Sequence, residues 1–157
     1  MSKNLCVVHH SRSGSTAVLC DAAVTGAGEV TGTTLGPVEV RVRGAFDAGP
    51  EDVLWADALL LATPARFGYM AGALKDFFER IYHPCLEQSV GLYYALIVKG
   101  DTDVDGAVAS VQKIATGLRW RLVLPPLTVV GDVTPADVEN AAELGGTLAA
   151  GLGEGIF

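Results

Sequence analysis

The chain has 157 residues, of which 50% are hydrophobic and 18% are charged, a composition typical of one globular domain with a substantial core. Its net charge is −7 and its eleven lysine and arginine residues form no basic cluster, which argues against binding to nucleic acid or to an anionic membrane. Three cysteines do not make a disulfide framework, and no signal peptide or membrane-length apolar segment is recognisable, so we expect a single cytoplasmic domain over residues 1–157 with no membrane insertion.

Five apolar segments of strand length alternate with segments of helical period, which predicts a parallel sheet with connecting helices. The first strand begins at Leu5. The second, residues 38–43, alternates valine with charged residues and is expected at a sheet edge. The third and fourth, which start at Ala58 and Leu92, are apolar on both faces, as central strands are. The fifth, residues 122–130, is interrupted by two prolines and is expected at the other edge, because proline cannot donate to a ladder.

The helices are predicted between these strands. Apolar residues recur every three or four positions over residues 70–81 and again over residues 104–118. Thr134 followed by Pro135 is typical of a capped helix start, and a short helix around residues 51–55 is expected to join the second and third strands. With right-handed crossovers, the simplest result is an α/β doubly wound, five-stranded parallel sheet of order 2-1-3-4-5.

The loop after the first strand is suited to a phosphate group. Gly14 permits a tight turn, the hydroxyls of Ser11, Ser13, Ser15 and Thr16 can donate hydrogen bonds, and the following helix offers the positive end of its dipole. An ordinary serine-rich helix cap would have the same composition, so the loop by itself leaves both interpretations open. The motifs of nucleoside-triphosphate hydrolases and of dinucleotide-binding folds are both missing from it.

The loop after the third strand combines a rigid proline, the guanidinium of Arg66 and the aromatic rings of Phe67 and Tyr69, a surface suited to a flat polar heteroaromatic ring. In the order 2-1-3-4-5 this loop and the phosphate loop meet where the strand order reverses, which is where such sheets bind ligands. Aromatics that only cover the core would be the alternative for this loop alone. The two loops together predict a mononucleotide such as FMN.

Two stretches resemble known families. Ser11-x-Ser13-Gly14-x-Thr16 resembles the flavodoxin phosphate loop, [ST]-x-[ST]-G-x-T. The stretch from Ala62 to Arg80 resembles the second flavin loop and helix of the tryptophan-repressor-binding-protein-like NAD(P)H:quinone oxidoreductases. The resemblance implies a flavodoxin-like fold, an FMN cofactor that carries the chemistry through its N5 without a catalytic side chain, and NAD(P)H as a possible electron donor. The cofactor-binding residues that it implies are Ser11, Arg12, Ser13, Gly14, Ser15, Thr16, Thr63, Pro64, Ala65, Arg66, Phe67, Gly68 and, in a third loop after the fourth strand, Lys99, Gly100 and Asp101.

The third loop departs from the quinone oxidoreductases, whose corresponding loop is long and helps to build a tetramer and the substrate pocket. Here it is short and acidic, with Asp101, Asp103 and Asp105. These carboxylates either form a solvated helix start or, if they border a flavin, lower its reduction potential.

Two functions therefore stay open. The second loop favours an NAD(P)H-dependent quinone oxidoreductase, in which Arg66 tunes the reduced ring or binds the nicotinamide dinucleotide. The short third loop and the acidic composition favour a flavodoxin-type carrier that exchanges electrons with basic protein partners. We also expect a homo-oligomer, with the apolar segment 142–157 either at its interface or covering the sheet.

A third reading is more remote. Cys6-x5-Arg12-Ser13 matches the C-x5-R-[ST] phosphate loop of low-molecular-weight tyrosine phosphatases, in which a thiolate attacks phosphate. Cys6 lies inside the first strand, however, so a buried core cysteine is the simpler interpretation. No metal site is expected, because the spacing of the histidines and of Cys85 matches no common zinc motif.

Overall fold

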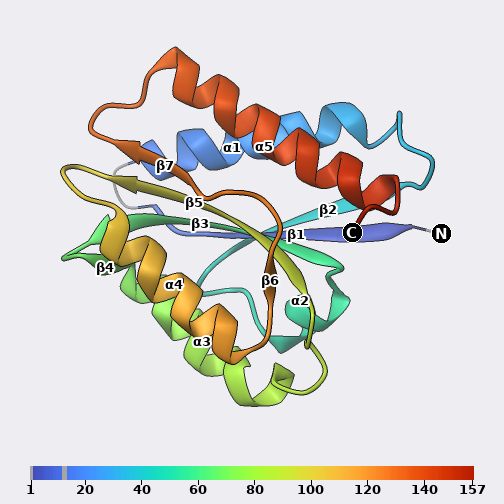
Figure 1. Cartoon of the computed structure of the whole chain (residues 1–157), viewed down its shortest axis with the longest axis horizontal. Coiled ribbons are helices and arrows are strands. Elements are labelled where there is room, and N and C mark those ends of the chain that lie inside the picture. Colours follow the sequence, from blue (N-terminus) through green and yellow to red (C-terminus); the bar gives the residue numbers. More distant parts are fainter. Residues whose placement is uncertain (1, 12–13) are drawn as a thin grey trace.

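The computed structural model describes residues 2–11 and 14–157. Its helices and strands are, in chain order, β1 (Lys3–His9), α1 (Ser15–Val30), β2 (Val38–Gly44), α2 (Pro50–Trp55), β3 (Ala58–Arg66), β4 (Tyr69–Met70), α3 (Gly72–Cys85), β5 (Tyr93–Gly100), α4 (Asp105–Gly117), β6 (Arg121–Leu122), β7 (Leu127–Val130) and α5 (Pro135–Gly153). Figure 1 shows a twisted sheet between two layers of helices, with α1 and α5 on one face and α2, α3 and α4 on the other. None of the helices in the described part of the chain is long and apolar enough to cross a membrane.

The sheet has the order that the sequence predicts. Strands run β2-β1-β3-β5, and both β6 and β7 pair with β5, all in parallel. β5 is thus the predicted fourth strand, and β6 with β7 is the predicted fifth, interrupted at Pro125 and Pro126. The order 2-1-3-4-5 is confirmed, with β2 and the divided fifth strand at the two edges.

Burial on both faces explains why the central strands are apolar throughout. Along β3, Leu60 belongs to the core under α1 and α5, while Leu59 and Leu61 belong to the core under α3 and α4. The side chains of a strand alternate between the two faces, so a strand covered on both sides needs an apolar residue at every position.

Helices α1 and α5 approach each other through glycines. A methyl group built on Gly26 would collide with the backbone of Ala142, and one built on Gly145 would collide with the backbone of Ala23. Thr134 caps α5, and Asp137 completes the capping box that the sequence predicts, in the place of the usual Glu or Gln.

The connection after the third strand differs from the expected loop. β3 continues to Arg66, the chain turns at Phe67 and Gly68, and β4 returns antiparallel, so that Ala65 pairs with Met70. Both turn residues have positive φ, 52° and 70°, as the twist of a two-residue hairpin requires. Met70, which the periodicity places in a helix, therefore lies in β4, and the helix begins only at Gly72.

One residue on the charged face of β2, Arg41, is less exposed than the alternation suggests. Arg41 Nη1 lies 3.0 Å from Oδ1 of Asp52, Arg43 Nε lies 3.4 Å from the same oxygen, and the Arg41 guanidinium stacks on Trp55. Asp52 is buried at the start of α2, where its other oxygen accepts a hydrogen bond from the Gly49 N–H. The two arginines thus fasten α2 to the edge strand.

Both ends of the described chain lie where the parallel strands begin, which we term the amino edge (Figure 1). The Lys3 N–H donates to the Pro37 carbonyl, and the Gly36 N–H donates to the carbonyl of Gly153. The first strand and the end of α5 are thereby joined through one loop. The opposite side, where the strands end, is the carboxyl edge, and it is free of both termini.

Candidate functional site

The segments expected to bind a ligand meet at the carboxyl edge. The loop from His10 enters α1 beyond β1, the β3–β4 hairpin extends beyond β3, and residues 99–101 end β5. Because β3 is hydrogen-bonded to both β1 and β5, these three segments are neighbours. Of the predicted site residues, Arg12 and Ser13 lie outside the described residues.

The start of α1 carries no protein anion. Gly14 is the N-cap residue with φ 91°, no side chain caps the helix, and its first turn contains no acidic residue. The Gly14 N–H itself donates to Ser11 Oγ over 3.1 Å. Among the described residues, no side chain therefore accepts from the first turn of this 16-residue helix, an arrangement that favours a phosphate over an ordinary cap.

The hairpin tip holds a residue in an unfavourable conformation. Phe67 is fully exposed, so its ring gains nothing from packing, and its φ of 52° is one that side chains other than Asn, Asp or Gly rarely adopt. Strain without compensating burial is typical of residues kept for function. The tip of the hairpin is therefore a candidate contact for a ligand or a partner.

Two buried hydroxyls fix the base of this hairpin. Thr63 Oγ1 accepts a hydrogen bond from the Ala71 N–H over 3.0 Å and donates to the carbonyl of Pro64. Ser110 Oγ, which projects from α4, accepts from the Met70 N–H over 3.1 Å. Both strands of the hairpin are thus held by side chains that the solvent does not reach.

Helix α4 also touches the hairpin turn. A methyl group built on Gly106 would collide with the carbonyl of Gly68. Only glycine at this position allows the start of α4 to approach the turn so closely. The spacing of these glycines in the sequence did not indicate the contact, because residues 68 and 106 come together only through the sheet.

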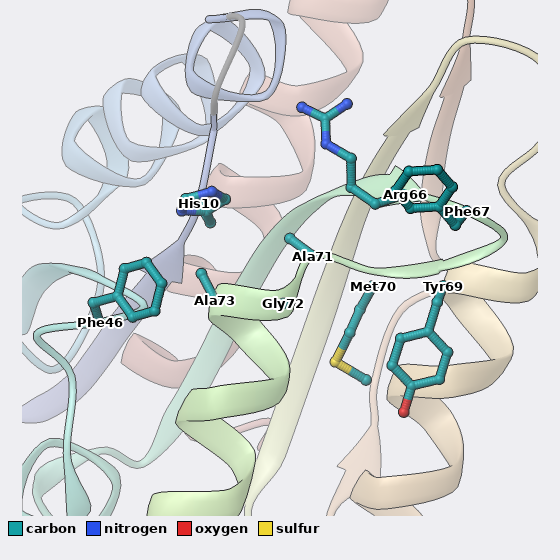
Figure 2. Close-up of a pocket in the computed structure, with 9 residues that line it drawn as sticks. All are labelled: His10, Phe46, Arg66, Phe67, Tyr69, Met70, Ala71, Gly72 and Ala73. Atoms are coloured by element: carbon teal, nitrogen blue, oxygen red, sulfur yellow. The ribbon is translucent and has the colours of Figure 1, made fainter.

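Within residues 2–11 and 14–157, two buried nitrogen atoms at the carboxyl edge find no hydrogen-bond partner: His9 Nδ1 and Arg66 Nε. Figure 2 shows the Arg66 side chain pointing away from Met70 and Tyr69, which extend from the opposite side of the hairpin. A buried polar atom that lacks a partner costs on the order of 1–3 kcal/mol. A ligand that bonds to these atoms would remove that cost.

The third loop pairs its first acid with a lysine. Lys99 Nζ lies 2.9 Å from Asp101 Oδ1, with the lysine side chain only 11% exposed and the carboxylate 86% exposed. The hydrogen bond and charge of Lys99, and to a smaller degree the charge of Arg66, lower the pKa of Asp101. Asp103 accepts from the N–H of Asp105, the first residue of α4, so these two acids form the solvated helix start that the sequence allows.

A cavity of about 620 Å³ lies beside the hairpin (Figure 2). Its walls include Arg66, Phe67 and Tyr69, together with His10 and Phe46, whose rings meet edge to face at 5.8 Å. Sequence analysis missed Phe46. It lies just beyond the end of β2, and its position after a strand is the signal that could have placed it at the carboxyl edge.

The thiol of Cys6 is unsuited to nucleophilic attack. The side chain is fully buried in the middle of β1, and burial, helped by the charge of Asp52, raises the pKa of Cys6 to about 12. A nucleophilic cysteine needs an accessible thiolate. The structure therefore gives no support to the phosphatase reading.

Comparison with known proteins settles the fold. A flavodoxin from the domain Archaea superposes with a TM-score of 0.79 at 17% identity, over 95% of this chain and 98% of that one. A WrbA-like flavodoxin from Agrobacterium tumefaciens superposes with a TM-score of 0.75 at 17% identity, over 94% and 95% of the two chains. The chain has the flavodoxin-like fold.

A sequence relative agrees with this flavodoxin-like fold. A flavodoxin of Aquifex aeolicus (strain VF5) is 33% identical over 75 residues, which span 48% of this chain and 38% of that protein. No protein-family model matches the chain. The fold that the sequence resemblance implied is confirmed, and its reversal of strand order lies between β1 and β3.

Proposed function

We propose that the chain binds FMN at the carboxyl edge and carries electrons between redox proteins in the cytoplasm. The observation that carries the FMN proposal is the site itself: an uncapped helix start beside a strained hairpin, with two buried nitrogen atoms that no described residue satisfies. FMN, when bound, supplies reversible redox chemistry that no protein side chain provides.

The described residues fit the two ends of FMN. Ser11 and residues 14–16 would hold the phosphate with hydroxyl groups and the free N–H groups of α1. Residues 63–68 would line the ribityl chain and one side of the flavin ring, and residues 99–101 would border the ring from β5. The buried nitrogens of His9 and Arg66 would then face a ligand rich in hydrogen-bonding atoms.

The carrier function is favoured by how little protein surrounds the hairpin. β5 ends at Gly100 and α4 begins at Asp105, so the third loop is too short to build a wall over the site. Phe67 stands fully exposed at the hairpin tip. A relative named flavodoxin and a net charge of −7, suited to basic redox partners, support the same function.

A second candidate, an NAD(P)H-dependent quinone oxidoreductase, is favoured by the cavity beside the hairpin. Its volume of about 620 Å³ falls in the range of small-molecule sites, and its walls carry the aromatic rings of Phe46, Phe67 and Tyr69 with the guanidinium of Arg66. Such a cavity suits a quinone or a nicotinamide ring.

The two candidates are separated by one series of absorbance spectra. The purified protein is mixed with FMN and desalted. One sample is then treated with NAD(P)H and a second sample with dithionite. Flavin bands that survive desalting, resist NAD(P)H and bleach with dithionite support the carrier. Bands that bleach with NAD(P)H and return with a soluble quinone support the enzyme, and protein that emerges without flavin contradicts both.

A further inference from the structure

Three basic side chains from three neighbouring strands lie on one face of the sheet at the carboxyl edge: His9 of β1, Arg66 of β3 and Lys99 of β5. Residue register places them there. His9 pairs with Ala62, which pairs with Ile97, and both partners belong to the core under α1 and α5. Side chains alternate along a strand, so every second residue returns to the same face. Arg66 lies four residues after Ala62, and Lys99 lies two residues after Ile97, so both lie on the face of His9.

Figure 2 agrees for Arg66, whose side chain points away from Tyr69 and Met70, the side chains on the other side of the hairpin. The phosphate loop and the positive end of α1 lie on this same face. The face therefore holds three basic side chains of a chain that is acidic as a whole.

Charges within this group do not cancel. Lys99 is compensated by Asp101 at 2.9 Å. Arg66 makes no ion pair with any residue in the described part of the chain, and its Nε is buried without a partner. One positive charge is left over beside the place where the flavin ring is proposed to lie.

The remaining acids of the third loop are poorly placed to offset it. Asp103 and Asp105 are exposed at the start of α4, which covers the other face of the sheet. Exposed charges are screened by water and salt, whereas partly buried charges are screened much less.

We propose that Arg66, with Lys99 neutralising Asp101, makes the flavin site electropositive and raises the reduction potential of bound FMN. This inference rests on the proposed FMN binding and reverses the sign that the acidic third loop suggests. Two-electron reduction adds negative charge to the flavin unless a second proton follows, so a nearby cation binds the reduced form more tightly than the oxidised form. The reduction potential measures that difference in affinity.

The test is the midpoint potential of bound FMN, measured against a reference dye at constant pH and salt. Arg66→Gln and Lys99→Gln should each lower the ratio of reduced to oxidised FMN affinity about tenfold, which is about 30 mV for a two-electron couple. Asp101→Asn should raise the potential, because it leaves Lys99 unpaired. Matched controls are Arg121→Gln on β6 and Lys113→Gln on α4, which should leave it unchanged.

Several results would overturn the inference. One is an Arg66→Gln potential equal to that of the wild type. Another is a fall in potential for Asp101→Asn, a variant whose exposed side chain poses no risk to folding. Wild-type protein that retains no FMN would instead refute the proposed function, and the inference with it. FMN retention with unmoved potentials refutes the inference alone.

Discussion

At the scale of single residues, Phe67 adopts a backbone conformation with positive φ that is unfavourable for phenylalanine. A φ of 52° costs roughly 1–2 kcal/mol for a residue with a Cβ atom, and full exposure returns none of it. Asn tolerates this conformation best after Gly. Phe67→Asn should therefore raise the free energy of unfolding of the FMN-free protein by about 1 kcal/mol.

Urea unfolding measures that gain. Phe46→Asn is the matched control: Phe46 is also an exposed aromatic of the carboxyl edge, but its φ is not positive, so the same replacement should give no increase. A loss of stability in Phe67→Asn would mean that the ring makes contacts which its exposure hides.

The buried cysteines should make the free energy of unfolding fall at alkaline pH. Burial raises the pKa of Cys6 and of Cys20 to about 12, from 9.0. Above pH 9 the unfolded chain releases these protons while the folded protein keeps them, so stability is intact below pH 9 and falls as the pH rises towards 12. Each thiol should remove up to about 1.4 kcal/mol per pH unit in that window.

Cys20→Ala tests this. Between pH 8 and pH 10 the variant should lose about 1 kcal/mol less unfolding free energy than the wild type, once its constant cost of truncation is subtracted. Parallel stability curves for the two proteins would show that the thiol does not titrate as its burial implies.

At the scale of elements, the β3–β4 hairpin depends on α4. Gly106 allows the helix to touch the carbonyl of Gly68, and Ser110 accepts the N–H of Met70. Gly106→Ala should push the turn away from its place and weaken FMN binding by about tenfold, that is about 1.4 kcal/mol. Fluorescence quenching on titration with FMN measures the dissociation constant.

Gly28→Ala serves as its control, since Gly28 also lies in a helix but a methyl group there meets no other atom. It should leave FMN affinity unchanged. Equal affinity in the Gly106 variant would show that the hairpin yields without loss and that its position does not govern binding.

At this scale, the strand order could be predicted from the sequence, whereas the β3–β4 hairpin could not. Two-sided apolar runs and edge signals in β2 and β7 were enough to predict strand order, because burial on both faces leaves a direct trace in composition. The hairpin was not foreseen, because a phenylalanine at positive φ contradicts the turn preference by which hairpins are recognised. For the site, the residues of the three segments lie at or just beyond strand ends and could be predicted, but Ser110 and Gly106 act through contacts between distant segments that leave no local pattern.

At the scale of the whole molecule, the packing of α1 against α5 depends on two glycines. Gly145 lies against the backbone of Ala23, and Gly26 against that of Ala142. Gly145→Ala should separate the helices and lower the free energy of unfolding by about 1–3 kcal/mol, the usual cost of overpacking.

Gly28→Ala, in the same helix pair but with open space, should instead raise stability by about 0.5–1 kcal/mol through the gain in helix propensity. The denaturant midpoints of the two variants, each compared with that of the wild type, measure these changes in stability. If both substitutions stabilise the protein, the close approach of the helices is not required for the fold.

The meeting of both chain ends at the amino edge bears on how this domain can be combined with others. Lys3 and Gly153 are linked through the single loop that contains Gly36 and Pro37, on the side of the sheet opposite the candidate site. A short peptide could therefore connect the ends, and the domain could be inserted into a surface loop of a larger protein with the carboxyl edge, which carries the candidate site, facing outwards.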